Sequence, residues 1–361
     1  MKIFDRYIVK QFLITTLFAI FAIVIIFVII DLMENLDDFI DGNADVFLVV
    51  QYYIYFMPEI IKLMIPVAML LSALFTTGRL SALNELTAMK AAGLSLYRYM
   101  IPLLIVAFLV SVFSIYFNGW VVPYTNKQKY SLARTYLHKY LSYISKSNIF
   151  IQDTENRIVS IGYFDESRGL ATNVTIEDFS EDDLTVVKAT YSAKQMQWDD
   201  YTQSWNLMNG NVRIFKGEQE DYKTFTILNI GRLNFKPDDV KKKQQRPDEM
   251  SYEEMKEFIE NQKRAGQDVS RWEVDFYSKI SFPFASLIVV LFGVPFSSIK
   301  RRSGVGVEFG IAVGISFLYM IFLKISQAFG YNGDLNPLFT AWLANLIFLL
   351  AGIYVLIRVP K

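Results

Sequence analysis

The chain has 361 residues, of which 53% are hydrophobic and 16% aromatic, and its mean hydropathy is positive, at +0.27. An ordinary soluble domain carries fewer apolar residues, so this composition indicates a membrane protein. The 36 basic and 36 acidic residues balance, which gives no overall attraction to nucleic acid. The sequence has no cysteine and a single histidine, His138, so it offers no disulfide, no thiolate metal site and little for histidine chemistry. We expect no metal, no cofactor and no catalytic residue.

The first predicted membrane span lies between Lys10 and Asp31, where twenty uncharged residues can cross a hydrocarbon core of ~30 Å as a helix. The run is too long for a signal peptide, and no small-residue cleavage site follows it. Basic residues precede the span and acidic residues follow it: Lys2, Arg6 and Lys10, then Asp31, Glu34, Asp37, Asp38, Asp41 and Asp45. The positive-inside rule therefore places the N-terminus in the cytoplasm.

Spans two and three are expected over residues 52–77 and 99–126. The stretch between them, residues 78–97, is polar and rich in small side chains, and we predict a single cytoplasmic helix there. At ~100° per residue, one stripe of this helix carries a carboxylate among small residues: Ser81, Glu85, Ala88 and Ala92. Two interpretations are open, a helix docked in a groove of a partner and a helix lying on the bilayer with Glu85 solvated.

Residues 127–250 change character, with alternating or β-branched runs separated by turn residues. The pattern predicts six to eight strands, with turns at Asn209-Gly210 and Lys216-Gly217. Short strands at this spacing favour an antiparallel β-sandwich, jellyroll-like, on the outer side of the membrane. An exposed edge of such a domain is a natural place for another β protein to add strands.

Residues 251–361 return the chain to the membrane. Ser251 and Glu254 form a capping-box pattern that begins an amphipathic connecting helix. Spans four to six are expected over residues 280–299, 305–328 and 335–357, with basic residues at their cytoplasmic ends. Span five carries glycine at every fourth position, Gly306, Gly310 and Gly314, which suits close helix packing, either at a moving seam or within the subunit. The fold class is thus a six-span helical membrane protein (3+3) with both termini cytoplasmic, organised as residues 1–126, 127–250 and 251–361.

Motifs for catalysis are missing from the sequence. None of the eighteen glycines belongs to a P-loop, and no serine, histidine and acid set can be built around one histidine. If the protein moves a substrate against a gradient, a partner or an ion supplies the energy. Lys62 and Lys324 each lie in an otherwise apolar span toward its outer end, where an ammonium group can meet the phosphates of a glycolipid. Snorkelling is the alternative, and Glu59 lies on the same helix face as Lys62 and is a possible partner for it.

Several segments resemble the LptF/LptG family, the permease subunits of the lipopolysaccharide exporter of Gram-negative bacteria. The segments are DRYIVKQF (residues 5–12), PVAMLLSAL (66–74), NELTAMKAAGLS (84–95), NQKRAGQDVSRWEVDFYSKISFPF (261–284) and GVEFGIAVGISFLYM (306–320). The resemblance covers nearly the whole chain and leans toward LptG, although the C-terminal end is closer to LptF. The layout of three spans, a β domain and three spans is also the layout of that family.

The resemblance implies a heterodimer of LptF-like and LptG-like subunits bound to a dimer of the cytoplasmic ATPase LptB, in the inner membrane. It implies extraction of lipopolysaccharide and its transfer along periplasmic β-jellyroll domains to LptC-like and LptA-like proteins. In that family the helix between spans two and three docks on the ATPase, and its glutamate corresponds to Glu85. Where LptG has lysines near the end of span one and after the proline of span two, this chain has Asp31 and Glu59, so the head-group site differs.

Two other classes of function are considered. An ion-coupled secondary transporter needs acidic or broken-helix sites near the middle of the membrane, whereas the mid-span runs here are uncharged. A membrane scaffold without transport would use the cytoplasmic helix only as a docking site. Recovery of a P-loop ATPase with the protein, lost in Glu85→Lys, would support the exporter, whereas a stable lone protein with ion-dependent uptake would contradict it.

Overall fold

The computed structural model describes residues 3–137, 149–165, 168–181, 183–217, 219–237, 239–240, 246–264, 268–298 and 305–358. The chain divides into two compact units. One consists of Met1–Leu132 with Pro247–Lys361, and the other of Ala133–Arg246. The β domain is therefore an insertion between two halves of a helical unit, within a few residues of the predicted limits of 127 and 250. His138 lies outside the described residues.

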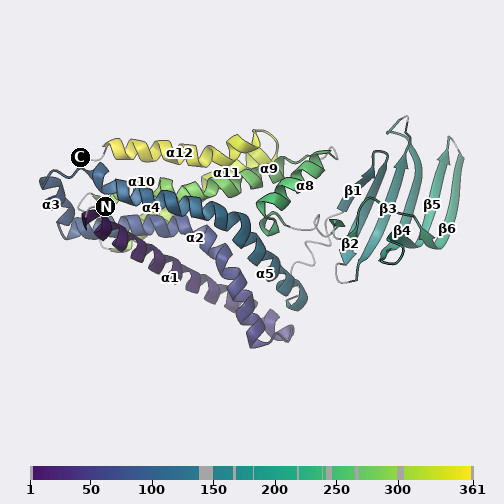
Figure 1. The fold of residues 1–361 in the computed structure, drawn as a ribbon, viewed down its shortest axis with the longest axis horizontal. Coiled ribbons are helices and arrows are strands. Elements are labelled where there is room, and N and C mark those ends of the chain that lie inside the picture. Colours follow the sequence, from purple (N-terminus) through teal and green to yellow (C-terminus); the bar gives the residue numbers. More distant parts are fainter. Residues whose placement is uncertain are drawn as a thin grey trace. The chain divides into compact units, whose positions relative to one another are not determined.

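The helical unit contains, within the described residues, six helical segments that are long and apolar enough to cross a membrane, as predicted (Figure 1). Two of the six segments consist of two α-helices each. A π-helical turn joins the helices of one segment, and a 3-10 turn joins those of the other. The elements are α1 (Ile3–Asp41), α2 (Val46–Ala82), α4 (Leu96–Tyr116) with η1 (Phe117–Val121) and α5 (Val122–Tyr136), α9 (Ser270–Ser281) with η3 (Phe282–Phe284) and α10 (Ala285–Ser298), α11 (Val305–Tyr331) and α12 (Pro337–Arg358).

The core of this unit lies where α2 and α10 pack together, with α1 and α4 against them. Met69, Leu70, Leu103 and Val290 are fully or almost fully buried there. Gly293 lets the two central helices approach closely, because a Cβ at this position would lie 2.7 Å from the Cβ of Ala73. The outer faces of α1, α4, α11 and α12 expose large apolar side chains, as expected of surfaces that face lipid.

The connecting helix α8 (Tyr252–Arg264) begins at the predicted capping box. The backbone N–H of Ser251 donates to Glu254 Oε2 at 2.8 Å, and the N–H of Glu254 donates to Ser251 Oγ at 3.2 Å. The ring of Tyr252 packs against Gly119, which lies in the π-helical turn η1, and its hydroxyl donates to the carbonyl of Ile115 at 3.2 Å. A Cβ on Gly119 would lie 2.0 Å from this ring, so the glycine is required for the contact.

The inserted unit contains an antiparallel sheet, as predicted, but its described strands do not form the expected two-sheet sandwich. They make one six-stranded sheet in chain order, because each strand is joined to the next by a hairpin. The strands are β1 (Ile149–Thr154), β2 (Arg157–Asp165), β3 (Leu170–Phe179), β4 (Val187–Asp199), β5 (Ser204–Lys216) and β6 (Gln219–Asn229).

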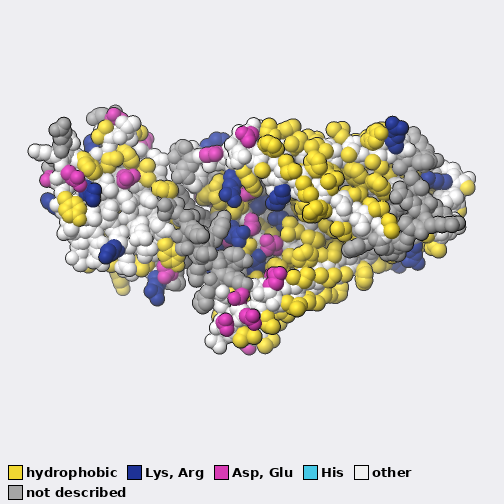
Figure 2. Space-filling model, turned by 180° about the vertical axis from the view of Figure 1, so that it is seen from behind, with side chains coloured by type: hydrophobic (Ala, Val, Ile, Leu, Met, Phe, Trp, Pro, Cys, Tyr) yellow, Lys and Arg dark blue, Asp and Glu magenta, His cyan; other side chains and the backbone are white. Residues whose placement is uncertain are grey.

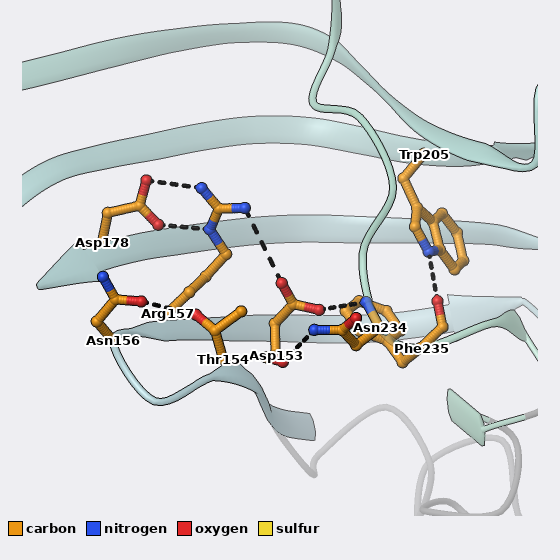
Figure 3. A network of polar contacts seen from close by, with 8 residues as sticks. All are labelled: Asp153, Thr154, Asn156, Arg157, Asp178, Trp205, Asn234 and Phe235. Carbon is orange, nitrogen blue, oxygen red and sulfur yellow. Dashed lines mark hydrogen bonds and ion pairs between the residues drawn. The ribbon is translucent and has the colours of Figure 1, made fainter.

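The chain after β6 covers one face of this sheet and completes its core. Leu233, Phe235 and Val240 of this return segment (residues 230–240) are buried with apolar residues of the strands. Polar contacts fix its path (Figure 3): Asn234 donates its backbone N–H to Asp153 Oδ1 at 2.5 Å, and the fully buried Trp205 donates its indole N–H to the carbonyl of Phe235 at 3.0 Å. A single sheet thus gains a core without a second sheet.

The two predicted turns have different outcomes. Lys216-Gly217 is a turn, with Gly217 at φ +66° between β5 and β6. The prediction of a turn at Asn209-Gly210 is wrong, because both residues lie inside β5. Asn209 adopts φ 51° and interrupts the pairing locally, and Gly210 lies under Phe225, where a Cβ would come within 2.5 Å of the ring.

Candidate functional site

The candidate site is a charged cluster among the helices, near the predicted outer end of α2. Glu59 and Lys62 lie on α2 between Pro58 and Pro66, in a segment where proline removes backbone donors from the helix. Figure 2 shows basic and acidic side chains together in a hollow between apolar surfaces of the helical unit. Charges enclosed in this way are costly in a membrane and mark functional sites.

Glu59 forms its ion pair with Lys129 of α5, not with Lys62 as the sequence allows. The Lys129 side chain is only 5% exposed, and its Nζ also lies 4.1 Å from the ring centroid of Tyr130 and 5.4 Å from that of Phe56. A buried ammonium requires a counter-charge, and the two rings add cation–π attraction. The structure therefore gives Glu59 a structural role in joining α2 to α5.

Lys62 is half-buried and forms no hydrogen bond or ion pair with any residue that the structure describes. The charges that act on it come from both signs, led by Asp248 and Glu59 and including Lys324 of α11. Lys279 of α9 is also an electrostatic neighbour. Lys62 is thus an ammonium group enclosed by the protein and left without a direct partner inside it.

The other two lysines of the cluster have hydrogen-bond partners. Lys279 is buried and donates from Nζ to the carbonyl of Met250 at 2.6 Å. Lys324 donates to Gln327 Oε1 at 3.1 Å, and the amide of Gln327 donates in turn to Ser278 Oγ at 3.2 Å. The lysines of α2, α9 and α11 therefore lie near one another, and hydrogen bonds to neutral groups orient two of them. The acids Asp248 and Asp275 act on the cluster without a direct ion pair to these lysines.

Asp31 lies at the edge of the same network. Its Oδ2 accepts a hydrogen bond from the hydroxyl of Tyr53 at 3.1 Å, and its charge acts on Lys129. Of the four residues that the sequence singled out, the structure brings Lys62, Lys324 and Glu59 together and links Asp31 to them through Lys129. Sequence reasoning missed Lys129 and Lys279, which lie just outside the uncharged runs of spans three and four.

The segment between α2 and α4, for which we predicted a single cytoplasmic helix, is not one helix. Residues 78–82 end α2, and a separate short helix, α3 (Glu85–Ala91), follows a turn at Asn84, whose φ is +58°. This change of direction breaks the stripe: Ser81 is buried in α2, at 4% exposure, whereas Ala88 and Ala92 are exposed around α3.

α3 presents a small-residue surface at its exposed side. Leu86 is 2% exposed and anchors α3 against the rest of the unit, whereas Ala88, Ala91 and Ala92 are exposed. Glu85, the first residue of α3, is half-buried and makes no ion pair within the described part of the chain. A partner can therefore approach α3 closely and meet one carboxylate.

The glycine stripe of α11 faces outward from the subunit at the positions where its surroundings are described. Gly310 and Gly314 are exposed, and a Cβ at either would meet no atom of the described chain within 4 Å. The surroundings of Gly306 lie outside the described residues. No described part of the subunit packs tightly against Gly310 or Gly314.

Six apolar helices with an inserted β domain, and a lysine cluster enclosed by those helices, define a multi-pass membrane protein with a polar site inside its helical unit. Residues 6–358 match the family described as Lipopolysaccharide export system permease LptF/LptG. The chain therefore belongs to the LptF/LptG family.

Individual relatives are distant but similar over almost their whole length. The Escherichia coli (strain K12) Lipopolysaccharide export system permease protein LptG is 23% identical over 365 residues, which cover 99% of this chain and 98% of the relative. The Haemophilus influenzae LptG protein is 25% identical over 352 residues, covering 96% and 95%. The E. coli (strain K12) LptF protein is 23% identical over 367 residues, covering 96% and 93%.

Proposed function

We propose that this protein is a transmembrane subunit of an ATP-driven exporter that extracts lipopolysaccharide from the inner membrane and passes it to a periplasmic bridge. The observation that carries the proposal is Lys62, an enclosed ammonium without a direct partner in the described chain, within a protein that matches the permease family from end to end. The subunit itself is not an enzyme, and ATP hydrolysis belongs to a partner.

Lys62 and Lys324 contact the phosphates of the lipid head group in this proposal. An ammonium that already lies in a hollow of the protein and has no direct ion-pair partner in the described chain binds a phosphate with little further desolvation. The acyl chains lie against the apolar outer faces of α1, α2 and α11. Glu59 and Asp31 hold the surrounding helices through Lys129 and Tyr53 and keep the cluster open.

The cytoplasmic segment couples the subunit to an LptB-like ATPase dimer. Glu85 and the exposed small residues Ala88 and Ala92 form the docking surface, and a cation of the ATPase pairs with the carboxylate. Ser81 supports this surface from inside α2 and does not touch the partner. The turns that flank α3 let it move as a unit with the ATPase.

The outward glycine face of α11 meets the paralogous LptF/LptG subunit, since Gly310 and Gly314 allow another helix to approach closely. The β domain lies in the periplasm and hands lipid to LptC-like and LptA-like β-jellyroll proteins. Both chain termini are cytoplasmic in this arrangement, as the charges around the spans favour.

Lipopolysaccharide cross-linking in cells tests the head-group site. A photoreactive residue beside the cluster, at the half-buried Leu63, is combined with Lys62→Glu, and with Lys256→Glu as a matched control on the exposed side of α8. Lys62→Glu is expected to lower lipopolysaccharide cross-linking at least about tenfold, because a charge-assisted bond worth ~1.5–3 kcal/mol becomes a repulsion. Unchanged cross-linking and export in Lys62→Glu would refute the head-group role.

Co-purification tests the coupling surface. The wild-type protein is expected to recover a P-loop ATPase, and Glu85→Lys to lose it, whereas the matched charge reversal Glu253→Lys on α8 retains it. A stable lone protein that shows ion-dependent uptake would instead establish a secondary transporter. An ATPase partner without lipopolysaccharide cross-linking would establish a scaffold.

A further inference from the structure

The β domain contains a pocket beside the return segment that the proposed function does not use. Its volume is about 380 Å³, and it lies between the β4–β5 hairpin and the chain that follows β6. We name it the return-segment pocket; its lining residues are Trp198, Gln203, Arg232, Leu233, Asn234 and Lys236. All of them belong to the inserted unit, and the volume falls in the range of small-molecule sites.

The backbone that carries the pocket is fixed before any ligand arrives. Gly231, at φ +80°, turns the chain out of β6, and its N–H donates to Asn229 Oδ1 at 2.8 Å. Asn234 is then held by Asp153 through two hydrogen bonds, from its backbone N–H and from its side-chain amide, at 2.5 Å and 2.7 Å (Figure 3). The bond from Trp205 to Phe235 fixes the next residue. Such preorganisation lowers the entropy cost of binding.

The charged residues that line the pocket are both basic. Arg232 and Lys236 are exposed, and neither side chain has an ion pair with the residues that the structure describes. The two acids of the nearby hairpin are engaged elsewhere: Asp200 accepts from the indole N–H of Trp198 at 2.9 Å, and Asp199 accepts from Thr202 Oγ1 at 2.8 Å. The return segment also carries Asp239, whose carboxylate accepts the backbone N–H of Lys236 at 2.9 Å. Neither cation of the pocket has a direct ion pair with the described residues.

The remaining lining groups suit a sugar ring. The N–H of Trp198 is occupied, and its ring packs edge-to-face with that of Trp205, at 5.2 Å between centroids. Trp198 therefore contributes an apolar aromatic group to the pocket lining. The amides of Gln203 and Asn234 each donate one hydrogen bond within the domain, to the carbonyls of Asp200 and Asp153. Their oxygens and second N–H groups are able to bond hydroxyl groups. Arg232 adds a planar fork of donors that matches phosphate or carboxylate oxygens. An apolar face, amides and paired cations are together the complement of a saccharide that bears an anionic group.

We propose that the return-segment pocket binds a phosphate-bearing saccharide, so that the β domain holds the head group of its lipid cargo there. The identification of this sugar with the head group of lipopolysaccharide rests on the proposed function. The pocket itself does not, because a free sugar phosphate has the same chemistry. The two sources are therefore separated in the experiment.

The test uses the full chain in phosphatidylcholine nanodiscs with a benzophenone amino acid at Gln203, inside the pocket, or at Tyr201, which is 100% exposed on the same hairpin. Purified lipopolysaccharide is the cross-linking probe, and glucosamine 6-phosphate, glucosamine and inorganic phosphate are competitors. Arg232→Gln/Lys236→Gln removes the two cations. Lys188→Gln/Lys223→Gln removes two exposed charges from β4 and β6 and serves as the matched control.

Cross-linking from position 203 is expected to exceed that from position 201, to fall at least about tenfold in the double pocket variant and to be unchanged in the control. Glucosamine 6-phosphate should compete better than glucosamine or phosphate alone. Equal loss in both double variants, or equal competition by inorganic phosphate, would overturn the proposal. Either result would mean that positive charges of the domain attract any anion without recognising the sugar.

The result is also distinguishable from a failure of the proposed function. Saturation-transfer NMR with glucosamine 6-phosphate reports on the pocket without any lipid. Suppose that the protein binds the free sugar, that Arg232→Gln/Lys236→Gln abolishes this binding, and that the protein does not cross-link to lipopolysaccharide. This result would support the sugar site and refute lipopolysaccharide as the cargo. Absence of sugar binding, in a protein that exports lipopolysaccharide, would refute the proposed ligand of the pocket and leave the proposed function intact.

Discussion

The ion pair between Glu59 and Lys129 predicts an asymmetric response to mutation. Lys129 is almost completely buried, whereas the Glu59 side chain is 23% exposed. Removing the carboxylate in Glu59→Gln leaves the buried ammonium without an ion pair, beside a neutral amide and the faces of Phe56 and Tyr130, with Asp31 as a more distant acid. Removing the ammonium in Lys129→Met leaves a carboxylate that water reaches, beside an apolar side chain that packs in the vacated space.

The magnitudes follow from this difference. Breaking a fully buried ion pair by removing one partner costs ~3–5 kcal/mol. Cation–π attraction to the two aromatic rings offsets about 1 kcal/mol of this cost for Lys129. We expect Glu59→Gln to lower the free energy of unfolding by about 2–4 kcal/mol. Lys129→Met should cost no more than about 2 kcal/mol, because the exposed part of Glu59 stays hydrated. The double variant should cost clearly less than the two single changes together.

Unfolding by SDS titration in mixed micelles measures these free energies, with Lys62→Met as the control. Lys62 has no ion pair in the described chain, so Lys62→Met should leave the free energy of unfolding unchanged or raise it, while lipopolysaccharide export falls. If Lys62→Met destabilises the protein as much as Glu59→Gln does, Glu59 pairs with Lys62 and the assignment of Lys129 is refuted.

Three further predictions concern the connecting helix and the β domain. Gly119→Ala should lower the free energy of unfolding by ~2–4 kcal/mol, because its Cβ would displace the ring of Tyr252, and Gly119→Ala/Tyr252→Ala should recover part of the loss. Burial favours the neutral form of Glu254, yet hydrogen bonds, led by the one from Lys127, hold its pKa below the ordinary 4.5. Its contribution to stability is therefore present above pH 4.5 and lost as the pH falls through the lowered pKa, and Glu254→Gln should flatten this part of an acid unfolding profile. Gly210→Ala should destabilise the β domain by at least about 2 kcal/mol in thermal unfolding followed by circular dichroism, and an unchanged midpoint would contradict the strand position found for this glycine.

The spans and the inserted β domain were predictable because their signals are local. An uncharged run of twenty residues has few alternatives to a membrane helix, and alternating apolar residues suffice to identify strands. The capping box at Ser251 and Glu254 was equally readable, since both partners lie within one turn. These features needed no knowledge of the rest of the chain.

Features that depend on distant partners were not predictable. The sequence offered Lys62 as the nearest cation to Glu59, whereas the actual partner, Lys129, is seventy positions away and becomes a neighbour only when α2 and α5 pack together. Asn209-Gly210 carries a strong local turn signal that tertiary context overrides, because the strands on both sides pair with β5 and Phe225 covers the glycine. The exposure of Gly310 was equally unpredictable, because the sequence does not show which face of α11 packs inside the subunit.

The segment between α2 and α4 shows the limit of helical periodicity as a guide to structure. The spacing of Ser81, Glu85 and Ala88 fits one helix, but the backbone turns at Asn84 and divides them between α2 and α3. Asparagine tolerates the left-handed conformation better than most residues, so this position was the available signal for a break. The turn at Asn84 therefore leaves Ser81 buried in α2, whereas Glu85 and the exposed small residues lie on α3.

Lipopolysaccharide in the inner membrane of depleted cells tests the central claim most directly. Cells in which this protein is depleted are complemented with the wild-type chain, with Lys62→Glu or with Lys256→Glu, and lipopolysaccharide is quantified in separated inner and outer membranes. Depletion and Lys62→Glu should each cause lipopolysaccharide to accumulate in the inner membrane, whereas the wild type and Lys256→Glu restore its export. An unchanged distribution of lipopolysaccharide after depletion would contradict the assignment of this protein to lipopolysaccharide export.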